Sequence, residues 1–284
     1  MFGNRPDGRQ IKTIDPIFKL IPHIMTHRSD AQLFYKVRVY TDVLDEYIRA
    51  HREEYPGLSY MAIVIAAFVR LLALRPSLNR FVVNGRLFAR RSFWVSFNLK
   101  RILLDDCVET CVKLPLNGTE DLGEINRQIN QQIELCRVPQ EENLTDKAAA
   151  MFTALPNLLV QISVGFLKFL DRIGCMPRWA LEASPFHTSF YFTNVKSLKL
   201  NYLYHHAYNF GTTSLFVAMG NSEDTVTFDH TGPHCRKSIT LGVTIDERIC
   251  DGLYLANSLT LFKHLMRDPS ALAVPLEAIT EDIP

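Results

Sequence analysis

The sequence predicts an α/β domain, and three observations support this prediction. Of the 284 residues, 47% are hydrophobic and 18 are Phe, enough for a sizeable core. Residues 61–74 form an apolar run of helical length that only Arg70 interrupts. Residues 238–245 alternate between polar and apolar side chains, as in a strand with one buried face, and residues 253–266 then carry apolar side chains at the period of a helix.

Local signals place the elements of the first half. An Asp, Ser or Thr before a helix accepts hydrogen bonds from its first amides, Pro suits the first helical position, and Asn-Gly favours a tight hairpin. The expected elements are an irregular arm (1–12), a helix begun by Asp15 and Pro16 and kinked at Pro22, a strand (33–40), a helix after Thr41, a buried helix opened by Ser59 (61–74), a hairpin turning at Asn84 and Gly85, strands (93–99, 107–114) and an amphipathic helix (120–136).

A helical insertion is expected over residues 138–184. Residues 151–167 carry no charge and are nearly long enough to span a bilayer, but Pro156 and Gly165 interrupt them and Lys168 follows directly. We therefore favour a helix buried against the domain or a neighbouring subunit. The alternatives are a bilayer span and membrane-surface contact through residues 151–174.

The C-terminal half predicts more strands before the strand over 238–245. We expect one strand over residues 187–194 and another over residues 210–220. The polar residues 221–224 predict a turn, after which the chain returns over 225–228 and enters a loop over 229–234.

Composition narrows the functional classes. The net charge is +1, so we expect no nucleic-acid partner. The six cysteines form no CxxC pair, and buried reduced thiols are favoured over a zinc pair of Cys107 and Cys111, so no metal is expected. The first residues lack the apolar segment of a signal peptide, which makes the cytoplasm the expected location.

The junction between the last strand and helix reads Ile-Asp-Glu-Arg-Ile-Cys-Asp-Gly over residues 245–252. It resembles the signature Asp-His-Arg-x-x-Asp-Gly of the chloramphenicol acetyltransferase-like superfamily, which includes the catalytic domains of dihydrolipoyl acyltransferases of 2-oxoacid dehydrogenase complexes. Asp246, Arg248, Asp251 and Gly252 match, whereas Glu247 stands at the position of the catalytic His. The likeness to the family is continuous over about residues 187–266. From the N-terminus to residue 136, only the order of helices and strands is alike.

The resemblance implies a fold and an assembly. The fold would be a chloramphenicol acetyltransferase-like mixed sheet with helices packed on one side, in a single domain over residues 1–284. The family assembles as trimers with active sites between subunits, so a homotrimer is expected. A coenzyme A thioester would be the co-substrate and a small molecule the acyl acceptor, and no lipoyl domain is expected in this chain.

The resemblance also implies roles for individual residues. Glu247 would be the base that deprotonates the acceptor, although a carboxylate is intrinsically a weaker base than imidazole by roughly 3 kcal/mol. Thr193, followed by Asn194, would donate a hydrogen bond to the oxyanion of the tetrahedral intermediate. Asp251 would pair with an Arg that the sequence does not identify, while Arg248 and Gly252 would support the turn. His205 or His206 is the alternative base, and a non-catalytic relative that binds an acyl thioester or a protein partner is the alternative function.

Overall fold

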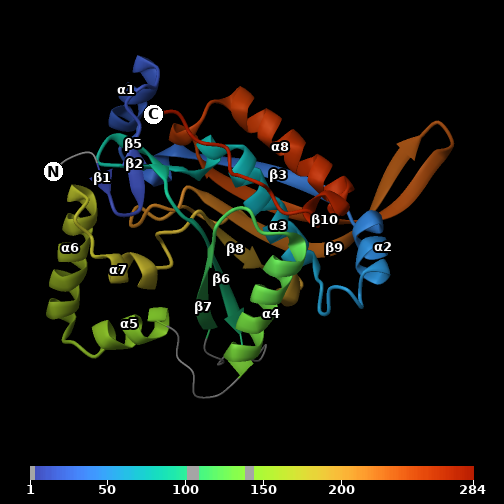
Figure 1. Cartoon of the computed structure of the whole chain (residues 1–284), viewed down its shortest axis with the longest axis horizontal. Helices are drawn as coiled ribbons and strands as arrows, with labels where there is room; N and C mark the ends of the chain where they lie inside the picture. The colour runs from blue at the N-terminus through green and yellow to red at the C-terminus, as the bar shows by residue number, and fades with distance from the viewer. Residues whose placement is uncertain (1–3, 101–108, 138–143) are drawn as a thin grey trace.

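The computed structural model describes residues 4–100, 109–137 and 144–284 (Figure 1). Its strands are β1 (Asn4–Arg5), β2 (Gly8–Gln10), β3 (Gln32–Tyr40), β4 (Arg80–Val83), β5 (Arg86–Arg90), β6 (Phe93–Lys100), β7 (Glu109–Leu116), β8 (Phe190–Asn194), β9 (Leu215–Asp229) and β10 (Gly232–Asp246). Its α-helices are α1 (Pro16–Ile24), α2 (Asp42–Ala50), α3 (Tyr60–Leu74), α4 (Leu122–Arg137), α5 (Leu144–Thr153), α6 (Asn157–Ile173), α7 (Arg178–Ala183) and α8 (Gly252–Arg267).

A six-stranded sheet in the order β3-β10-β9-β8-β6-β7 forms the centre of the molecule. Strand β8 runs parallel to both of its neighbours, β6 and β9, while the other pairs are antiparallel. The sheet is therefore mixed, as predicted. A second, antiparallel sheet has the order β1-β2-β5-β4.

Helices α3, α4 and α8 cover one face of the large sheet and bury the core (Figure 1). Helix α3 is buried on all sides because the C-terminal tail also packs on it, where Arg70 donates hydrogen bonds to the carbonyls of Ala271 and Val274. The Phe68 ring lies 4.5 Å from that of Phe262 on α8 and 5.6 Å from that of Phe190 on β8. The predicted packing of helices on one side is confirmed.

Residues 199–214, which we call the strap, cross the opposite face of the sheet without regular structure. A Cβ at Gly242 of β10 would lie 1.9 Å from the carbonyl oxygen of Leu203, and one at Gly220 of β9 would lie 1.2 Å from that of Asn201. The strap thus rests directly on the backbone of the sheet. Strand β10 is consequently buried on both faces over its last nine residues, 238–246.

Several local predictions are confirmed. Asp15 accepts a hydrogen bond from the Ile17 amide at the start of α1, and Ser59 accepts one from the Ala62 amide in α3. Asn84 and Gly85 turn the β4–β5 hairpin with φ values of 50° and 70°.

The predicted turn at 221–224 and loop at 229–234 are wrong. Strand β9 continues to Asp229 and pairs with β10 from Gly232, so the chain turns only at His230 and Thr231. The paired residues 222–238 form a ribbon that projects from the domain (Figure 1). Pairing across the two strands outweighs the turn tendency of the polar residues.

The described part of the arm, residues 4–12, is more ordered than predicted, because β1 and β2 form within it. Strand β2 pairs with β5, and the buried Arg5 side chain lies 2.8 Å from Asp7 and 2.6 Å from Asp171 on α6. The ion pairs therefore tie this arm to the helical segment 144–183.

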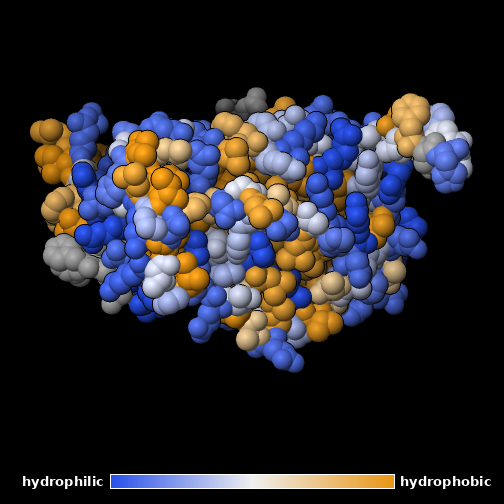
Figure 2. Space-filling view, turned by 90° about the horizontal axis from the view of Figure 1, so that it is seen from above, coloured by the Kyte–Doolittle hydropathy of each residue, from blue (hydrophilic) through white to orange (hydrophobic). Residues whose placement is uncertain are grey.

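The apolar face of α6 is not buried against the domain as expected. Asp171 is the buried residue of this helix, while Leu158, Ile162 and Phe166 are each more than half exposed. Ile17 and Ile24 of α1 are similarly exposed. Figure 2 shows hydrophobic residues at the end of the molecule where Figure 1 places α1 and α6, and at the tip of the projecting ribbon. No helix among the described residues is both long and apolar enough to cross a membrane.

Candidate active site

The signature residues form a tight turn between β10 and α8. Strand β10 ends at Asp246, a single 3-10 turn covers Glu247–Ile249, and α8 begins at Gly252. Asp251 is the N-cap of α8, and its carboxylate accepts a hydrogen bond of 2.7 Å from the Tyr254 amide. The exposed Asp251 therefore caps the helix, and the arginine pairing expected for it is instead made by another residue of the turn.

Asp246 is that residue. Its carboxylate is completely buried and accepts two hydrogen bonds of 2.7 Å from the Arg248 guanidinium, in a bidentate arrangement. The Nε of Arg28, also buried, lies 3.5 Å from Asp246 Oδ2, the oxygen that Arg248 Nη2 binds as well. Burial lowers the pKa of Arg28. The negative charge of Asp246 opposes this shift, and the positive charge of Arg248 adds to it.

This buried cluster fixes the turn to two distant segments. Arg248 donates to the Met25 carbonyl at 2.8 Å, just after α1, and Arg28 donates to the Tyr208 carbonyl of the strap at 2.7 Å. The Asp246 amide donates to the Ser214 carbonyl at 2.9 Å. The Arg248 and Arg28 side chains and the Asp246 amide are thus all bound to residues outside the turn. The backbone at Glu247 is therefore held rigidly.

Glu247 itself points to solvent. Its side chain is exposed, and none of the ion pairs that the structure shows among the described residues involves it. The Arg248 guanidinium faces Asp246, so it does not compete for the Glu247 carboxylate. A carboxylate in this position is free to accept a proton from a bound molecule.

Thr193 lies far from Glu247 within one chain. Thr193 on β8 pairs with Ala218 on β9, which pairs with Gly242 on β10. Glu247 follows Gly242 by five residues, which corresponds to about 16 Å along the strand, and the two residues are also two strands apart, about 10 Å. One chain thus does not bring together the predicted base and the predicted oxyanion donor.

His205 comes closer to the strand that carries Thr193. Tyr191 and Thr193 alternate with the core residues Phe190 and Phe192, so they face the strap. The ring centroids of His205 and Tyr191 are 6.0 Å apart. Among the predicted bases, His205 is therefore one that lies on the same face of the sheet as Thr193.

The adjacent His205 and His206 do not face opposite ways, as two neighbouring residues on a strand would. The strap is irregular, and the rings of His205 and His206 stack with centroids 5.2 Å apart. His205 also stacks on Phe216 at 5.3 Å, and its burial lowers its pKa.

Sequence reasoning missed a buried polar cluster beneath α6. His187, completely buried, places Nδ1 2.7 Å from Ser184 Oγ and Nε2 3.4 Å from Asp171 Oδ1. These atoms are the ones that a hydrolase uses, but the same Asp171 oxygen is bound by Arg5 at 2.6 Å and the His187 ring has no exposed surface. We interpret the cluster as a structural link between α6 and the segment that leads into β8. Its Arg5 partner lies 166 residues from Asp171 in sequence, too far to be predicted.

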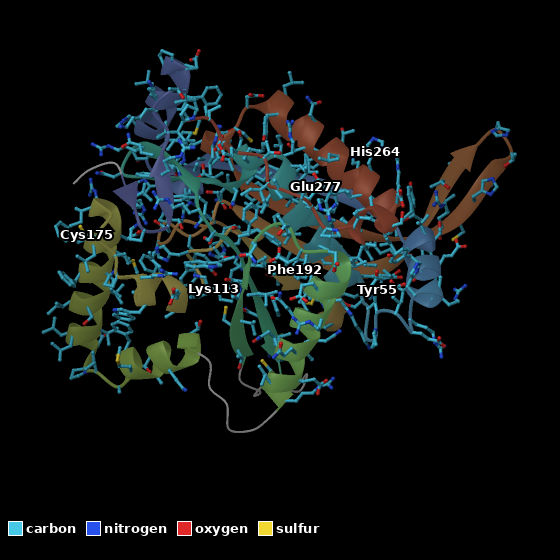
Figure 3. The ribbon with its side chains drawn as sticks, viewed as in Figure 1. Tyr55, Lys113, Cys175, Phe192, His264 and Glu277 are labelled. Carbon is cyan, nitrogen blue, oxygen red and sulfur yellow. The ribbon has the colours of Figure 1, made fainter. Side chains whose placement is uncertain are left out.

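Lys113 is a second titratable group that the sequence did not single out. It projects from β7 toward α7 (Figure 3), where Nζ donates to the carbonyls of Leu181 and Ser184 at 2.5 and 2.9 Å. Burial lowers its pKa to about 7, and the ammonium lies 4.0 Å from the centroid of the Trp94 ring. It borders a pocket of about 390 Å³ between β6, β7 and α7.

In the part of the chain that the structure describes, no three His, Cys, Asp or Glu side chains gather as a metal site requires. The zinc pair considered from the sequence involves Cys107, which lies outside the described residues.

Comparison of the structure with solved structures identifies the fold. No family model and no curated protein sequence matches the chain. The probable dihydrolipoamide acetyltransferase from Listeria monocytogenes aligns with a TM-score of 0.56 at 16% identity, over 90% of this chain and 93% of its own. The cubic core of the pyruvate dehydrogenase multienzyme complex aligns with a TM-score of 0.60 at 11% identity, over 93% and 94%.

A chloramphenicol acetyltransferase also aligns, with a TM-score of 0.55 at 11% identity, over 91% of this chain and 99% of its own. The chain therefore has the chloramphenicol acetyltransferase-like fold. At these identities the likeness establishes the fold alone.

Proposed function

We propose that the protein transfers an acyl group from a coenzyme A thioester to a hydroxyl, amine or thiol acceptor, at a site completed by a second copy of the chain. The observation that carries this proposal is the turn at Glu247. Buried Asp246 and its two arginines hold that turn rigidly, and they leave the Glu247 carboxylate exposed and unpaired by Arg248. The relatives of the same fold that are named acetyltransferases support the reaction class.

The proposed reaction uses Glu247 as general base. Its carboxylate takes the proton of the acceptor as the acceptor attacks the thioester carbonyl, and a tetrahedral intermediate forms. The Thr193 hydroxyl of another copy donates a hydrogen bond to the new oxyanion, a contribution of roughly a hundredfold or more in rate. Collapse of the intermediate breaks the carbon–sulfur bond, and the departing thiolate takes the proton back from Glu247.

A second copy is needed because of the strand register. Within one chain Glu247 and Thr193 are separated by about 16 Å along the strands and by two strands laterally. Hydrogen bonding to one reacting centre requires both side chains within a few ångströms of it. A homotrimer, the assembly that the family resemblance implies, is the arrangement we propose.

A second candidate base has its own support. His205 stacks against Phe216 and contacts Tyr191 on the face of the sheet that Thr193 shares. An acyl transfer based on His205 would need one chain only, and it predicts that Glu247 is dispensable. A non-catalytic relative that binds a thioester would retain binding without turnover.

Titration calorimetry with coenzyme A and acetyl-coenzyme A, beside a thiol-release assay with mixed acceptors, tests these alternatives. Our proposal predicts binding in the parent and in Glu247→Gln, with thiol release at least a hundredfold slower in the variant. Asp251→Asn, which alters an exposed carboxylate in the same turn, is the matched control and should retain most activity. Loss of turnover in His205→Gln but not in Glu247→Gln would assign the base to the strap instead.

A further inference from the structure

A cavity of about 470 Å³ opens between α1, the β4–β5 hairpin and α6. Its size falls within the usual range for small-molecule sites. The walls also include residues 209–211 of the strap and the guanidinium-bearing residues Arg28 and Arg248. The cavity therefore borders the signature turn at Arg248, and α6, which belongs to the predicted insertion, forms one of its walls.

The lining is strongly cationic. Arg28, Arg248, Lys168 and Arg172 contribute to it, together with two histidines of α1 and the turn that follows it. Among the described residues that line the cavity, Asp171 is the one carboxylate, and Arg5 already binds it at 2.6 Å.

The buried Arg28 beside the cavity has no hydrogen-bonded carboxylate of its own among the described residues. Arg28 and Arg248 share the single carboxylate of Asp246, and Arg248 takes both of its close hydrogen bonds. Arg28 is almost completely buried, its Nε has no hydrogen-bond partner, and the nearest carboxylate oxygen is 3.5 Å away. Burying a guanidinium without a close, hydrogen-bonded partner is costly, and a bound anion would supply such a partner.

The rim leaves further cationic groups available. Arg172 is exposed and its Nε donates at 3.2 Å to a neutral acceptor, the side-chain oxygen of Asn84. Lys168 lies one helical turn before Arg172, so both face the cavity from the same side of α6. Planar guanidinium groups and a flexible ammonium together suit the oxygens of phosphate.

We propose that this cavity binds the phosphate groups of a small anionic ligand, with Arg28 and Arg248 at its base and Lys168 and Arg172 at its rim. The ligand class is a phosphorylated or pyrophosphate-bearing molecule. Its source is either coenzyme A or an independent phosphorylated compound. The site does not depend on acyl transfer, because it is inferred from the cavity and its charges alone.

The test is titration calorimetry of the full chain with inorganic pyrophosphate at low ionic strength. We expect one site per chain, with an affinity that falls as salt is added. The double variant Lys168→Gln/Arg172→Gln should weaken binding at least tenfold. Both positions contribute from the rim, so the fold should be retained, which circular dichroism would verify.

The matched control is Arg49→Gln/Arg52→Gln, which removes the same charge from exposed positions in and after α2, at the other end of the molecule (Figure 1). It should bind pyrophosphate like the parent. Absence of pyrophosphate binding in the parent, or equal weakening in both double variants, would overturn the proposal.

Coenzyme A added to the pyrophosphate complex identifies the source of the phosphate. Displacement of pyrophosphate by coenzyme A, lost in Lys168→Gln/Arg172→Gln, would show that the cavity holds the phosphates of the acyl donor. Simultaneous binding would show that an independent phosphorylated ligand occupies it. Both results support an anion site, and neither requires turnover, so the site and the acyltransferase proposal can fail separately.

Discussion

Replacing Asp246 with Asn tests whether the buried ion cluster holds the signature turn. The substitution keeps the size of the side chain but removes the charge that two buried guanidiniums share. Breaking a buried pair by removing one partner costs about 3–5 kcal/mol, since the remaining charge stays buried without compensation. For a domain with a typical stability of about 5–15 kcal/mol, this loss is a large part of the total.

Urea denaturation followed by circular dichroism measures this free energy of unfolding. We expect a lower midpoint with an unchanged slope, since the surface exposed on unfolding stays the same. Asp251→Ala is the matched control in the same turn, and loss of its N-cap hydrogen bond should cost only about 1 kcal/mol.

A thermodynamic cycle with Arg248→Gln isolates the pair itself. Asp246→Asn and Arg248→Gln should be coupled by at least 1 kcal/mol, because their groups share two hydrogen bonds of 2.7 Å. If Asp246→Asn destabilised the protein no more than Asp251→Ala does, the reasoning that this cluster anchors the turn would be refuted.

Three further predictions concern packing and titration, each measured by urea denaturation. Gly242→Ala should lower the free energy of unfolding by about 1–3 kcal/mol, because the added Cβ would meet the Leu203 carbonyl. Gly165→Ala on α6, whose Cβ would meet nothing within 4 Å, should be neutral or stabilising. Equal effects of the two variants would contradict the close contact between the strap and the sheet. Burial lowers the pKa of Lys113 to about 7, below its unfolded value, so stability should rise with pH between 7 and about 10, and Lys113→Met should remove that rise. Burial alone would raise the pKa of Asp171, but His187 and Arg5 outweigh burial and hold this pKa well below the usual range. The parent should therefore lose stability as pH falls below about 4, and its stability advantage over Asp171→Asn should shrink there. A stability difference that stayed constant with pH would contradict this reasoning.

Elements whose signals are local could be predicted from the sequence. The caps at Asp15 and Ser59 and the Asn84-Gly85 hairpin depend on a few neighbouring residues, and each appears where predicted. The ribbon was missed because its polar residues resemble a turn, while its stability comes from pairing of two strands.

The site was only partly predictable, because its contacts join distant residues. The signature located the turn that carries Glu247, but nothing in the sequence indicates that Asp246, and not Asp251, would bind Arg248 and lie beside Arg28. Arg28 reaches Asp246 only through the fold, just as Arg5 reaches Asp171 across 166 residues. The apolar composition of α6 likewise predicted burial against the domain or a neighbouring subunit, and within one chain its apolar side chains are exposed.

The central claim is that Glu247 of one copy and Thr193 of another act on the same acyl group. It is tested most directly by co-assembly of two variants, Glu247→Gln and Thr193→Val, each of which should be inactive or nearly so alone. The two tagged chains are unfolded together in denaturant, refolded as mixed assemblies and assayed for thiol release.

If sites form between copies in a cyclic assembly, random mixing of equal amounts should leave about a quarter of the sites with both native residues. Thiol release should then recover to about a quarter of the value of parent protein refolded in the same way. Mixed assemblies that stay as inactive as the separate variants, while the parent refolds with full activity, would contradict a site shared between copies.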